Sequence, residues 1–335
     1  MKLPQQFLLA IIVPAIFSVP AMLNAEQIVD VGDTFRCYFQ DKGNNRFNYI
    51  PGGSTANWTE EQIAATKRAL KTWDSLILNK PGRTLTVGLF WYSHGNQRAL
   101  AGAGSRLLEP FGRPGLQKVP TIAERIWRDA YSVAGYEESA FDIHVFCNSD
   151  NQNRFYFGEA PFAGGPKTRT YDFQSVLTHE IGHGLGFLSM ATSDGKFPSY
   201  TYFNGTAIHY TAFDSLMTDE SGKKLIDKAV ADPSAVVFTA GEKILLEGTN
   251  LTVYNPTTWS DGSSMAHVDS VSDSDALMQY SIPNDISRRS LTEAEIGLMR
   301  QMGWSMIPEP SFFGLLAGTL ALFLAGTRRR RRGNA

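Results

Sequence analysis

Two histidines separated by three residues constrain this chain more than any other feature of its sequence. His179 and His183 flank Glu180 in a stretch, Phe173 to Phe187, whose apolar residues recur at helical spacing. Residues four apart project from the same face of a helix, so both imidazoles can bind one tetrahedral metal ion. Glu180 lies on the adjacent face, where it can accept a proton from a water molecule that the metal activates. The segment predicts a helix that carries a zinc site; the alternative is an ordinary core or surface helix.

The residues after the second histidine carry a family resemblance. Gly186 stands three positions after His183 and resembles the extended motif of the metzincin zinc proteases, in which the helix ends and the chain turns. That family usually supplies a third histidine, or sometimes an aspartate, three residues later, but this chain has Ser189 there. A serine hydroxyl is a poor zinc ligand. The third ligand therefore comes from elsewhere in the chain, or the site is impaired.

His267 and the residues that follow it resemble the leishmanolysin family of metzincins. In that family an insertion separates the helix glycine from the third histidine, and a turn bearing a methionine follows soon after. The resemblance spans roughly Asp172 to Trp304, although the middle of the insertion has no match. It implies that His267 is the third ligand and that Met278 packs its thioether under the metal without binding it.

The remaining histidines have different contexts. His94 lies in a turn after an early strand, and His144 lies inside a later strand, where a satisfied core or rim histidine is the simpler interpretation. His209 follows a tyrosine-rich, strand-like stretch and is kept as the alternative third ligand.

Tyr280 stands two residues after Met278, as a tyrosine does in astacin-like and serralysin-like metzincins. The resemblance implies a catalytic role in which the phenol stabilises developing negative charge. Leishmanolysin itself lacks this tyrosine, so a packed turn aromatic is the alternative. Asp269, Asp273 and Asp275 could hold calcium, but no EF-hand spacing is present and a solvated acidic loop is the preferred interpretation.

The rest of the pattern predicts an α+β fold. Strands are expected within Asp33–Tyr49 and at Leu85–Tyr92 and Phe141–Cys147, with a glycine-rich loop at Gly95–Gly115. Helices are expected from the capping box at Thr59 to Ile77, near Ile122–Val133, at Ala212–Met217 and at Leu291–Met302. This order suits a zincin- or metzincin-like mixed sheet with flanking helices and an active-site helix, followed by a loop-rich C-terminal lobe. Phe141–Cys147 is the expected edge strand above the cleft.

The two ends of the chain indicate export. Residues 1–25 have a basic start, an apolar stretch and a small-residue close at Ala25, as in a signal peptide. Because Leu23 is bulky for a cleavage site, an uncleaved anchor is the alternative. Residues 26–306 form the expected catalytic domain.

Residues 307–335 carry Pro308-Glu309-Pro310, a short apolar segment and an arginine run. This tail resembles the PEP-CTERM sorting signal, which implies initial anchoring in the inner membrane and an exosortase-type processing enzyme as a partner. The alternative is an ordinary C-terminal membrane anchor, in which the arginines hold the cytoplasmic end. Either reading places the folded domain in the cell envelope or outside the cell.

Net charge and cysteine content bear on two further questions, whether the chain binds nucleic acid and whether it contains a disulfide. A net charge of -2 provides no basic field for phosphates, so nucleic acid is not expected as a partner. The chain has 2 cysteines, Cys37 and Cys147. In an oxidising compartment they predict one disulfide, with two buried thiols as the alternative.

Together these features predict a zinc-dependent endopeptidase that cleaves protein or peptide substrates outside the cytoplasm. The alternative from another class is a cell-surface or matrix protein that keeps the fold and a zinc site but has little activity. Ser189 favours this alternative, whereas Glu180 opposes it, because a structural zinc site has no use for a base. Ester or glycan hydrolysis is a weaker third option.

Overall fold

The computed structural model describes residues 26–78, 82–95, 99–105, 115–118, 121, 123, 141–162, 170–202, 205–284 and 286–307. The expected signal peptide, the expected sorting tail from residue 308 onward and the expected helix near Ile122–Val133, apart from Ala123, lie outside these residues. Within them, no helix is both long and apolar enough to cross a membrane.

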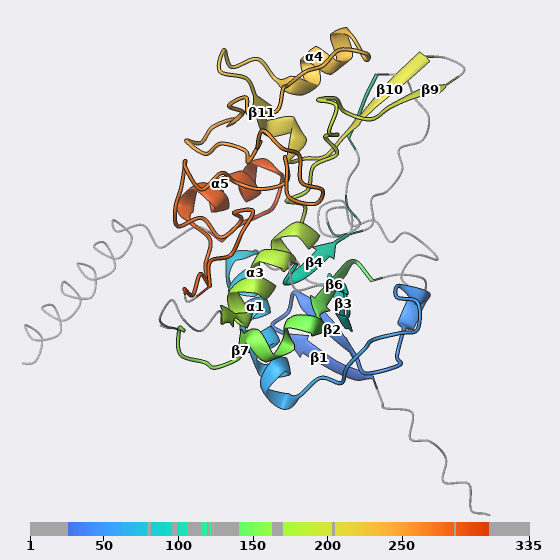
Figure 1. The fold of residues 1–335 in the computed structure, drawn as a ribbon, viewed down its shortest axis with the longest axis vertical. Coiled ribbons are helices and arrows are strands. Elements are labelled where there is room, and N and C mark those ends of the chain that lie inside the picture. The colour runs from blue at the N-terminus through green and yellow to red at the C-terminus, as the bar shows by residue number, and fades with distance from the viewer. Residues whose placement is uncertain are drawn as a thin grey trace, which may run out of the picture.

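A five-stranded mixed sheet forms the lower part of the molecule (Figure 1). In spatial order its strands are β1 (Gln27–Val31), β2 (Phe35–Gln40), β3 (Leu85–Tyr92), β6 (Ile143–Asn148) and β4 (Ala101–Gly104). The three inner strands are parallel, and each edge strand pairs antiparallel with its neighbour. Both faces of the inner strands bury apolar side chains, as expected for parallel strands covered on both sides.

Two helices cover one face of this sheet, α1 (Glu60–Leu76) and α3 (Phe173–Gly184). The predicted capping box at Thr59 and Gln62 starts α1. Trp73 on α1 donates its indole N–H to the carbonyl of Thr178 on α3, at 2.8 Å. This bond fixes the two helices against each other at the level of the histidine pair.

The other sheet face carries an aromatic cluster in which Phe90 and Phe141 are buried. Tyr49 stacks on Phe141, and its hydroxyl accepts a bond from the Phe141 N–H at 3.0 Å. The cluster therefore attaches the segment around Tyr49 to the sheet and covers part of this face.

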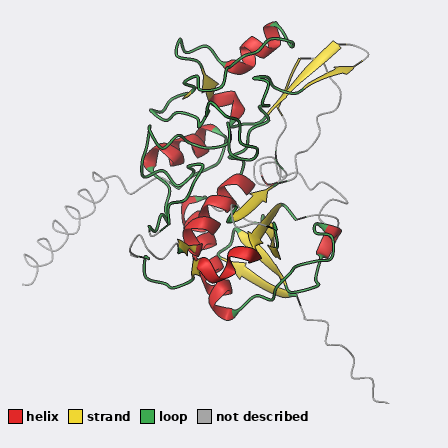
Figure 2. Ribbon diagram, in the orientation of Figure 1, coloured by secondary structure: helices red, strands yellow, loops and turns green. Residues whose placement is uncertain are grey.

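The residues from 186 to 306, here called the C-terminal lobe, lie above α3 and consist mostly of loops (Figures 1 and 2). Its regular elements are β9 (Ser199–Tyr202), β10 (Gly205–Tyr210), β11 (Met217–Thr218), α4 (Leu225–Ala231), β12 (Leu245–Leu246) and α5 (Glu293–Gln301), and β5 (Gly115–Lys118) pairs with β10. The lobe also contains the 3-10 turn η3 (Asp214–Leu216). Shorter elements elsewhere are β7 (Phe155–Tyr156), β8 (Tyr171–Asp172) and the 3-10 turns η1 (Arg46–Asn48) and η2 (Ser149–Arg154). The predicted α+β class with a mixed sheet is confirmed.

The edge strand was predicted wrongly. Phe141–Cys147 corresponds to β6, which lies between β3 and β4. The edge strand on this side of the sheet is β4, inside the segment predicted as a glycine-rich loop. Its sequence Ala-Gly-Ala-Gly has none of the β-branched or aromatic residues that signal a strand, and only pairing with β6 makes it one.

The predicted disulfide between Cys37 and Cys147 is also wrong. Cys37 lies on β2 and Cys147 on β6, and β3 runs between them. Strands two positions apart are separated by about 10 Å, too far for a disulfide. Both thiols are free and buried, and burial raises the pKa of each.

Two helical predictions need smaller corrections. The segment Ala212–Met217 forms the 3-10 turn η3 rather than an α-helix. The final helix, α5, was predicted to begin at Leu291 but begins at Glu293 with Thr292 as its N-cap, because Thr292 and Glu295 form a capping box.

A buried ion pair gives the first testable consequence of this fold. Arg289 contacts the fully buried carboxylate of Asp172 at 2.6 Å and donates to the carbonyl of Gly158. Arg289→Met should lower the free energy of unfolding by about 3 kcal/mol, because it leaves a buried charge without its partner. Urea denaturation measures the loss.

The matched control is Arg36→Met, which breaks an ion pair with Asp30 in which both side chains are exposed. An exposed pair contributes little to stability, so this variant should unfold like the parent protein. Equal losses in the two variants would contradict the assignment of Arg289 as a buried anchor.

Candidate metal centre

Helix α3 presents His179 and His183 from the interior of the molecule. Its N-cap, Asp172, accepts a hydrogen bond from the backbone N–H of Ser175, and every residue of the helix is buried. The helix is buried all round because α1 and the sheet cover one side and the C-terminal lobe covers the other (Figure 1). The two imidazoles therefore face a space inside the protein rather than bulk solvent.

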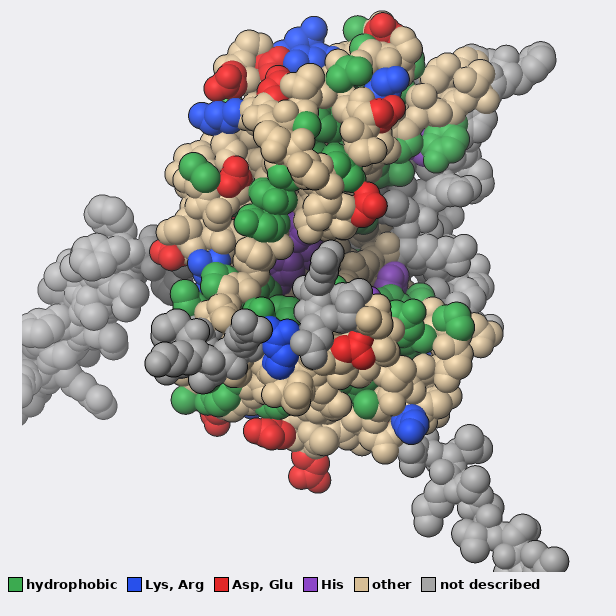
Figure 3. All heavy atoms as spheres, in the orientation of Figure 1, with side chains coloured by type: hydrophobic (Ala, Val, Ile, Leu, Met, Phe, Trp, Pro, Cys, Tyr) green, Lys and Arg blue, Asp and Glu red, His purple; other side chains and the backbone are tan. Residues whose placement is uncertain are grey.

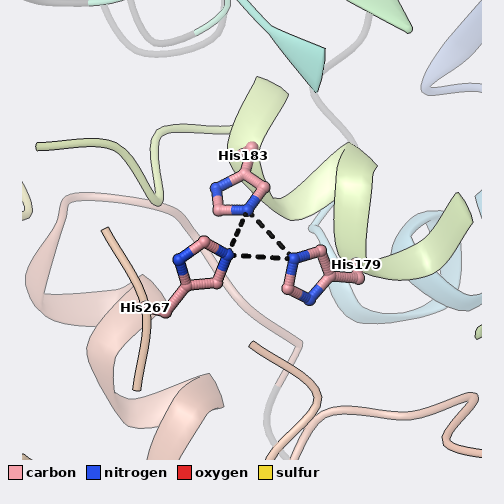
Figure 4. A group of neighbouring side chains, drawn as sticks. All are labelled: His179, His183 and His267. Carbon is pink, nitrogen blue, oxygen red and sulfur yellow. Dashed lines mark hydrogen bonds between the residues drawn. The ribbon is translucent and has the colours of Figure 1, made fainter. Parts of the chain in front are cut away.

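His267 of the C-terminal lobe completes a cluster of three imidazoles (Figure 4). The Nε2 atom of His183 lies 3.0 Å from that of His179 and 3.1 Å from that of His267, and the third separation is 3.3 Å. Nitrogens that bind one tetrahedral metal at 2.0–2.1 Å are about 3.3 Å apart. The predicted convergence of the three rings is thus observed, with spacings close to those a metal requires.

Each of the three rings has its Nδ1 atom within hydrogen-bonding distance of a backbone carbonyl. The Nδ1 atoms lie 2.9 Å from the carbonyl of Leu277 (His179), 2.5 Å from that of Phe187 (His183) and 2.8 Å from that of Ser263 (His267). Because a carbonyl only accepts, each Nδ1 must carry the hydrogen, which leaves a lone pair on each Nε2. Such outer contacts typically fix the tautomer and orientation of metal-binding histidines.

Three lone pairs that face one another without a hydrogen between them repel, and a cation among them removes the repulsion. The donor set therefore fits a metal ion. In the described part of the chain, these histidines are the one group of histidine, cysteine, aspartate or glutamate side chains placed to share an ion.

Burial keeps the three imidazoles in the neutral form that binds metals. Burial lowers the pKa of His179 to about 3, with a smaller contribution from His183. Burial likewise lowers the pKa of His183 and of His267, and for His267 the two neighbouring rings add to the effect. At neutral pH all three side chains are ready to act as ligands.

Backbone pairing in the C-terminal lobe brings His267 to α3. The carbonyl of His267 accepts the N–H of Tyr254 at 2.8 Å, and the N–H of Val268 donates to the carbonyl of Met278 at 2.8 Å. The N–H of Met278 in turn donates to the buried carboxylate of Glu295, at 2.7 Å. The third histidine and the methionine are thereby placed together by strand-like pairing and by the start of α5.

Gly182 lets Met278 pack against the active helix. A Cβ atom at Gly182 would lie 2.6 Å from the sulfur of Met278 and 3.2 Å from Trp73. Met278 is fully buried beneath the turn of α3 that carries His179 and His183. The glycine is needed here for close approach, and any larger residue must displace the methionine.

Glu180 points to the sheet edge beside the histidines. Burial raises its pKa to about 8, and a hydrogen bond from the backbone N–H of Ala103 on β4 opposes this shift. Ala103 was not predicted to take part in the site, because a backbone N–H in an Ala-Gly segment leaves no signal in the sequence. Glu295 was also missed, although its capping box with Thr292 is visible in the sequence.

A cleft of about 570 Å³ connects the cluster with the surface. Its walls are residues 99–103 of the β4 segment, the histidine face of α3, the turn at 188–191 and the loops 259–267 and 279–282. Figure 3 shows histidine side chains in a hollow near the middle of this face. Both the three imidazoles and Glu180 are therefore accessible to a ligand from outside.

Tyr280 lies in the cleft wall and is 43% exposed. Its ring stacks on that of Tyr254, with centroids 3.8 Å apart and planes 7° from parallel. Tyr280 thus lines the same cleft as the histidines, and its ring contacts Tyr254. Its catalytic role stays a prediction.

The other histidines and the acidic loop lie outside the cluster. His209 packs on Tyr200 in the β9–β10 hairpin with the two rings tilted, and His144 packs among the aromatic residues on the other sheet face. Asp269 and Asp273 each accept a backbone N–H two residues further along the chain. These bonds are typical of local turns in a solvated loop.

No protein-family model, no curated protein and no solved structure matches this chain.

The contact between α3 and Met278 predicts the effect of adding one methyl group. Gly182→Ala should lower the free energy of unfolding by about 1–3 kcal/mol, because the new Cβ overpacks against Met278 and Trp73. Urea denaturation in the presence of a chelator separates this loss from any effect of metal.

Gly297→Ala in α5 is the control, because a Cβ there meets no atom within 4 Å. Alanine is the better helix former, so this variant should gain up to about 1 kcal/mol. A Gly182→Ala variant that gained stability in the same way would show that Met278 does not pack against α3.

Proposed function

We propose that this chain is an exported zinc-dependent endopeptidase of the metzincin type. One observation carries the proposal: the Nε2 atoms of His179, His183 and His267 converge beside Glu180 at the base of an open cleft. Three protein ligands with an open fourth position are typical of catalytic zinc sites, whereas structural sites are closed by four. Imidazole nitrogens at near-tetrahedral spacing favour zinc among the common metals.

A zinc ion held there would lower the pKa of a water molecule toward neutrality and polarise a carbonyl group. Glu180 is the residue placed to accept the proton of the attacking water and to pass it to the leaving amine. The Ala103 N–H holds its carboxylate at the cleft wall. Burial raises the pKa of Glu180 to about 8, which makes its carboxylate a stronger base, and the charge of a bound zinc ion would favour the ionised form.

The shape of the cleft supports a peptide substrate. Among the described strands, β4 pairs only with β6, and its segment lines the cleft beside Glu180. An extended peptide can add to such an edge through its backbone, which positions a peptide bond without requiring one particular side chain. An open cleft of this kind also admits an internal peptide bond of a longer chain, as an endopeptidase requires.

Tyr280 is the proposed donor to the negative charge that develops on the attacked carbonyl. Its support is its place in the cleft wall and the exposure of its side chain. The alternative is a packed aromatic residue held by Tyr254, which the stacked geometry favours.

The proposed location rests on the sequence of the two ends. Residues 1–25 would direct export, and the segment after Pro310 would hold the chain in the inner membrane until an exosortase-type enzyme processes it. The substrate would then be a protein or peptide of the cell envelope or of the surroundings.

The third ligand offers a direct test of the metal site. The parent protein should bind one zinc per chain. His267→Ala should weaken zinc binding as severely as His183→Ala, because either change leaves two protein ligands where catalytic sites have three. Competition with a chromophoric chelator measures the affinity.

His209→Ala is the matched control, since His209 lies in the β9–β10 hairpin and should not affect zinc affinity. The reverse pattern, with loss in His209→Ala and none in His267→Ala, would contradict the proposed ligand set.

The proposed base is tested by Glu180→Gln. The amide keeps the shape of the side chain but cannot accept a proton, so the variant should retain zinc and lose about 10²–10⁴-fold in rate. Cleavage of a fluorescence-quenched protein substrate, with and without chelator, measures the rate. A parent protein that binds zinc but cleaves no substrate would instead support the alternative of a weakly active surface or matrix protein.

A further inference from the structure

The turn that follows α3 is held by a buried carboxylate. Ser189, which stands where the extended zinc motif would place a third ligand, instead donates its hydroxyl to Asp214, with Oγ and Oδ1 2.6 Å apart. Asp214 lies in η3 and is completely buried. The serine thus links the turn to a fixed point in the C-terminal lobe.

Asp214 also accepts hydrogen bonds from the backbone near Ser189. Its other carboxylate oxygen, Oδ2, accepts the backbone N–H groups of Met190 at 3.0 Å and Thr211 at 2.8 Å. The hydroxyl of Thr211 accepts the N–H of Asp214 and donates to the carbonyl of Leu188. Three consecutive residues of the turn are therefore anchored, either by the carboxylate or by the threonine that it orients.

The anchored turn begins at the residue that orients a histidine of the metal centre. The carbonyl of Phe187 accepts the Nδ1–H of His183 at 2.5 Å, and the Phe187 N–H donates to the carbonyl of Gly182 at 3.1 Å. The Phe187 ring packs on Phe213, the neighbour of Asp214 in sequence, with centroids 5.2 Å apart. The direction of the Phe187 carbonyl thus depends on the segment that Asp214 anchors.

We propose that Asp214 is a positioning residue for the metal centre. Through its bonds to Ser189, Met190 and Thr211 it fixes the turn that directs the Phe187 carbonyl at His183, and so fixes the ring whose Nε2 faces the other two imidazoles. The inference rests on the proposed role of His183 as a ligand and is independent of whether the protein hydrolyses peptides.

The test measures Zn²⁺ affinity and the visible absorption of the Co²⁺-loaded protein, using the full chain. Asp214→Ala should weaken Zn²⁺ binding by about tenfold, since loss of outer contacts to a metal ligand typically costs 10–100-fold. It should also alter the Co²⁺ spectrum, because His183 is no longer held in one orientation. Ser189→Ala should change the Zn²⁺ affinity and the Co²⁺ spectrum in the same direction as Asp214→Ala, but by a smaller amount.

Asp214→Asn should restore most of the affinity lost in Asp214→Ala. The amide oxygen can accept the two backbone N–H groups, and the amide nitrogen can donate to Ser189, so the anchor survives without its charge. An asparagine variant as weak as the alanine variant would overturn the hydrogen-bonding role.

Asp172→Asn is the matched control. Asp172 is also a fully buried aspartate that accepts a serine hydroxyl and a backbone N–H, but it caps the end of α3 away from the turn. Its substitution should lower the melting temperature while leaving Zn²⁺ affinity and the Co²⁺ spectrum unchanged. A merely structural role for Asp214 would produce this same pattern and would refute the inference.

The remaining outcomes are also decisive. If Asp214→Ala does not fold, Ser189→Ala decides, and parent-like affinity and spectrum in that variant overturn the proposal. If the parent chain binds no Zn²⁺ at all, the proposed function fails together with this inference. If the parent binds Zn²⁺ and a folded Asp214→Ala binds it equally well, only this inference fails.

Discussion

The main physical constraint on this fold is the repulsion among three buried imidazole nitrogens, which face one another without a shared hydrogen. Each ring has its Nδ1–H bonded to a backbone carbonyl, so the Nε2 lone pairs cannot turn away without breaking a buried hydrogen bond. A cation relieves this repulsion, and its binding free energy would add to the stability of the folded chain. Because His267 comes from the C-terminal lobe and the other two rings from α3, such an ion would also join the two parts of the molecule.

The packing around α3 explains how the protein holds this arrangement. Gly182 lets both Trp73 of α1 and Met278 pack closely against the helix, and the Met278 N–H donates to Glu295 at the start of α5. Glu295 also accepts the Thr292 N–H, so one side chain both caps α5 and fixes the segment beneath the histidines. The final helix is thereby part of the support of the site.

The sheet contributes to the site mainly through backbone. β4 contains only alanine and glycine, yet the Ala103 N–H contacts the Glu180 carboxylate and the strand forms one wall of the cleft. Small side chains leave the backbone of this wall accessible to a ligand, which is the property a peptide-binding edge needs. This explains why a segment predicted as a loop is a strand in the structure: its hydrogen bonds to β6 define it, and no side-chain pattern is required.

The sequence by itself determined those features that depend on residues close together in the chain. Helix α1 with its capping box, helix α3, and the presentation of His179 and His183 from one face follow from spacings of three and four residues. The local sequence does not distinguish His209 from His267 as the third histidine. The prediction of His267 depended on a family resemblance. Only the tertiary structure brings the His267 ring to α3. Tertiary structure also decided that β4 is an edge strand, that β3 separates the two cysteines, and that Ser189 faces Asp214 rather than the histidines. These outcomes depend on pairing between distant segments, whose free energy comes from burial and backbone hydrogen bonds that no local pattern records.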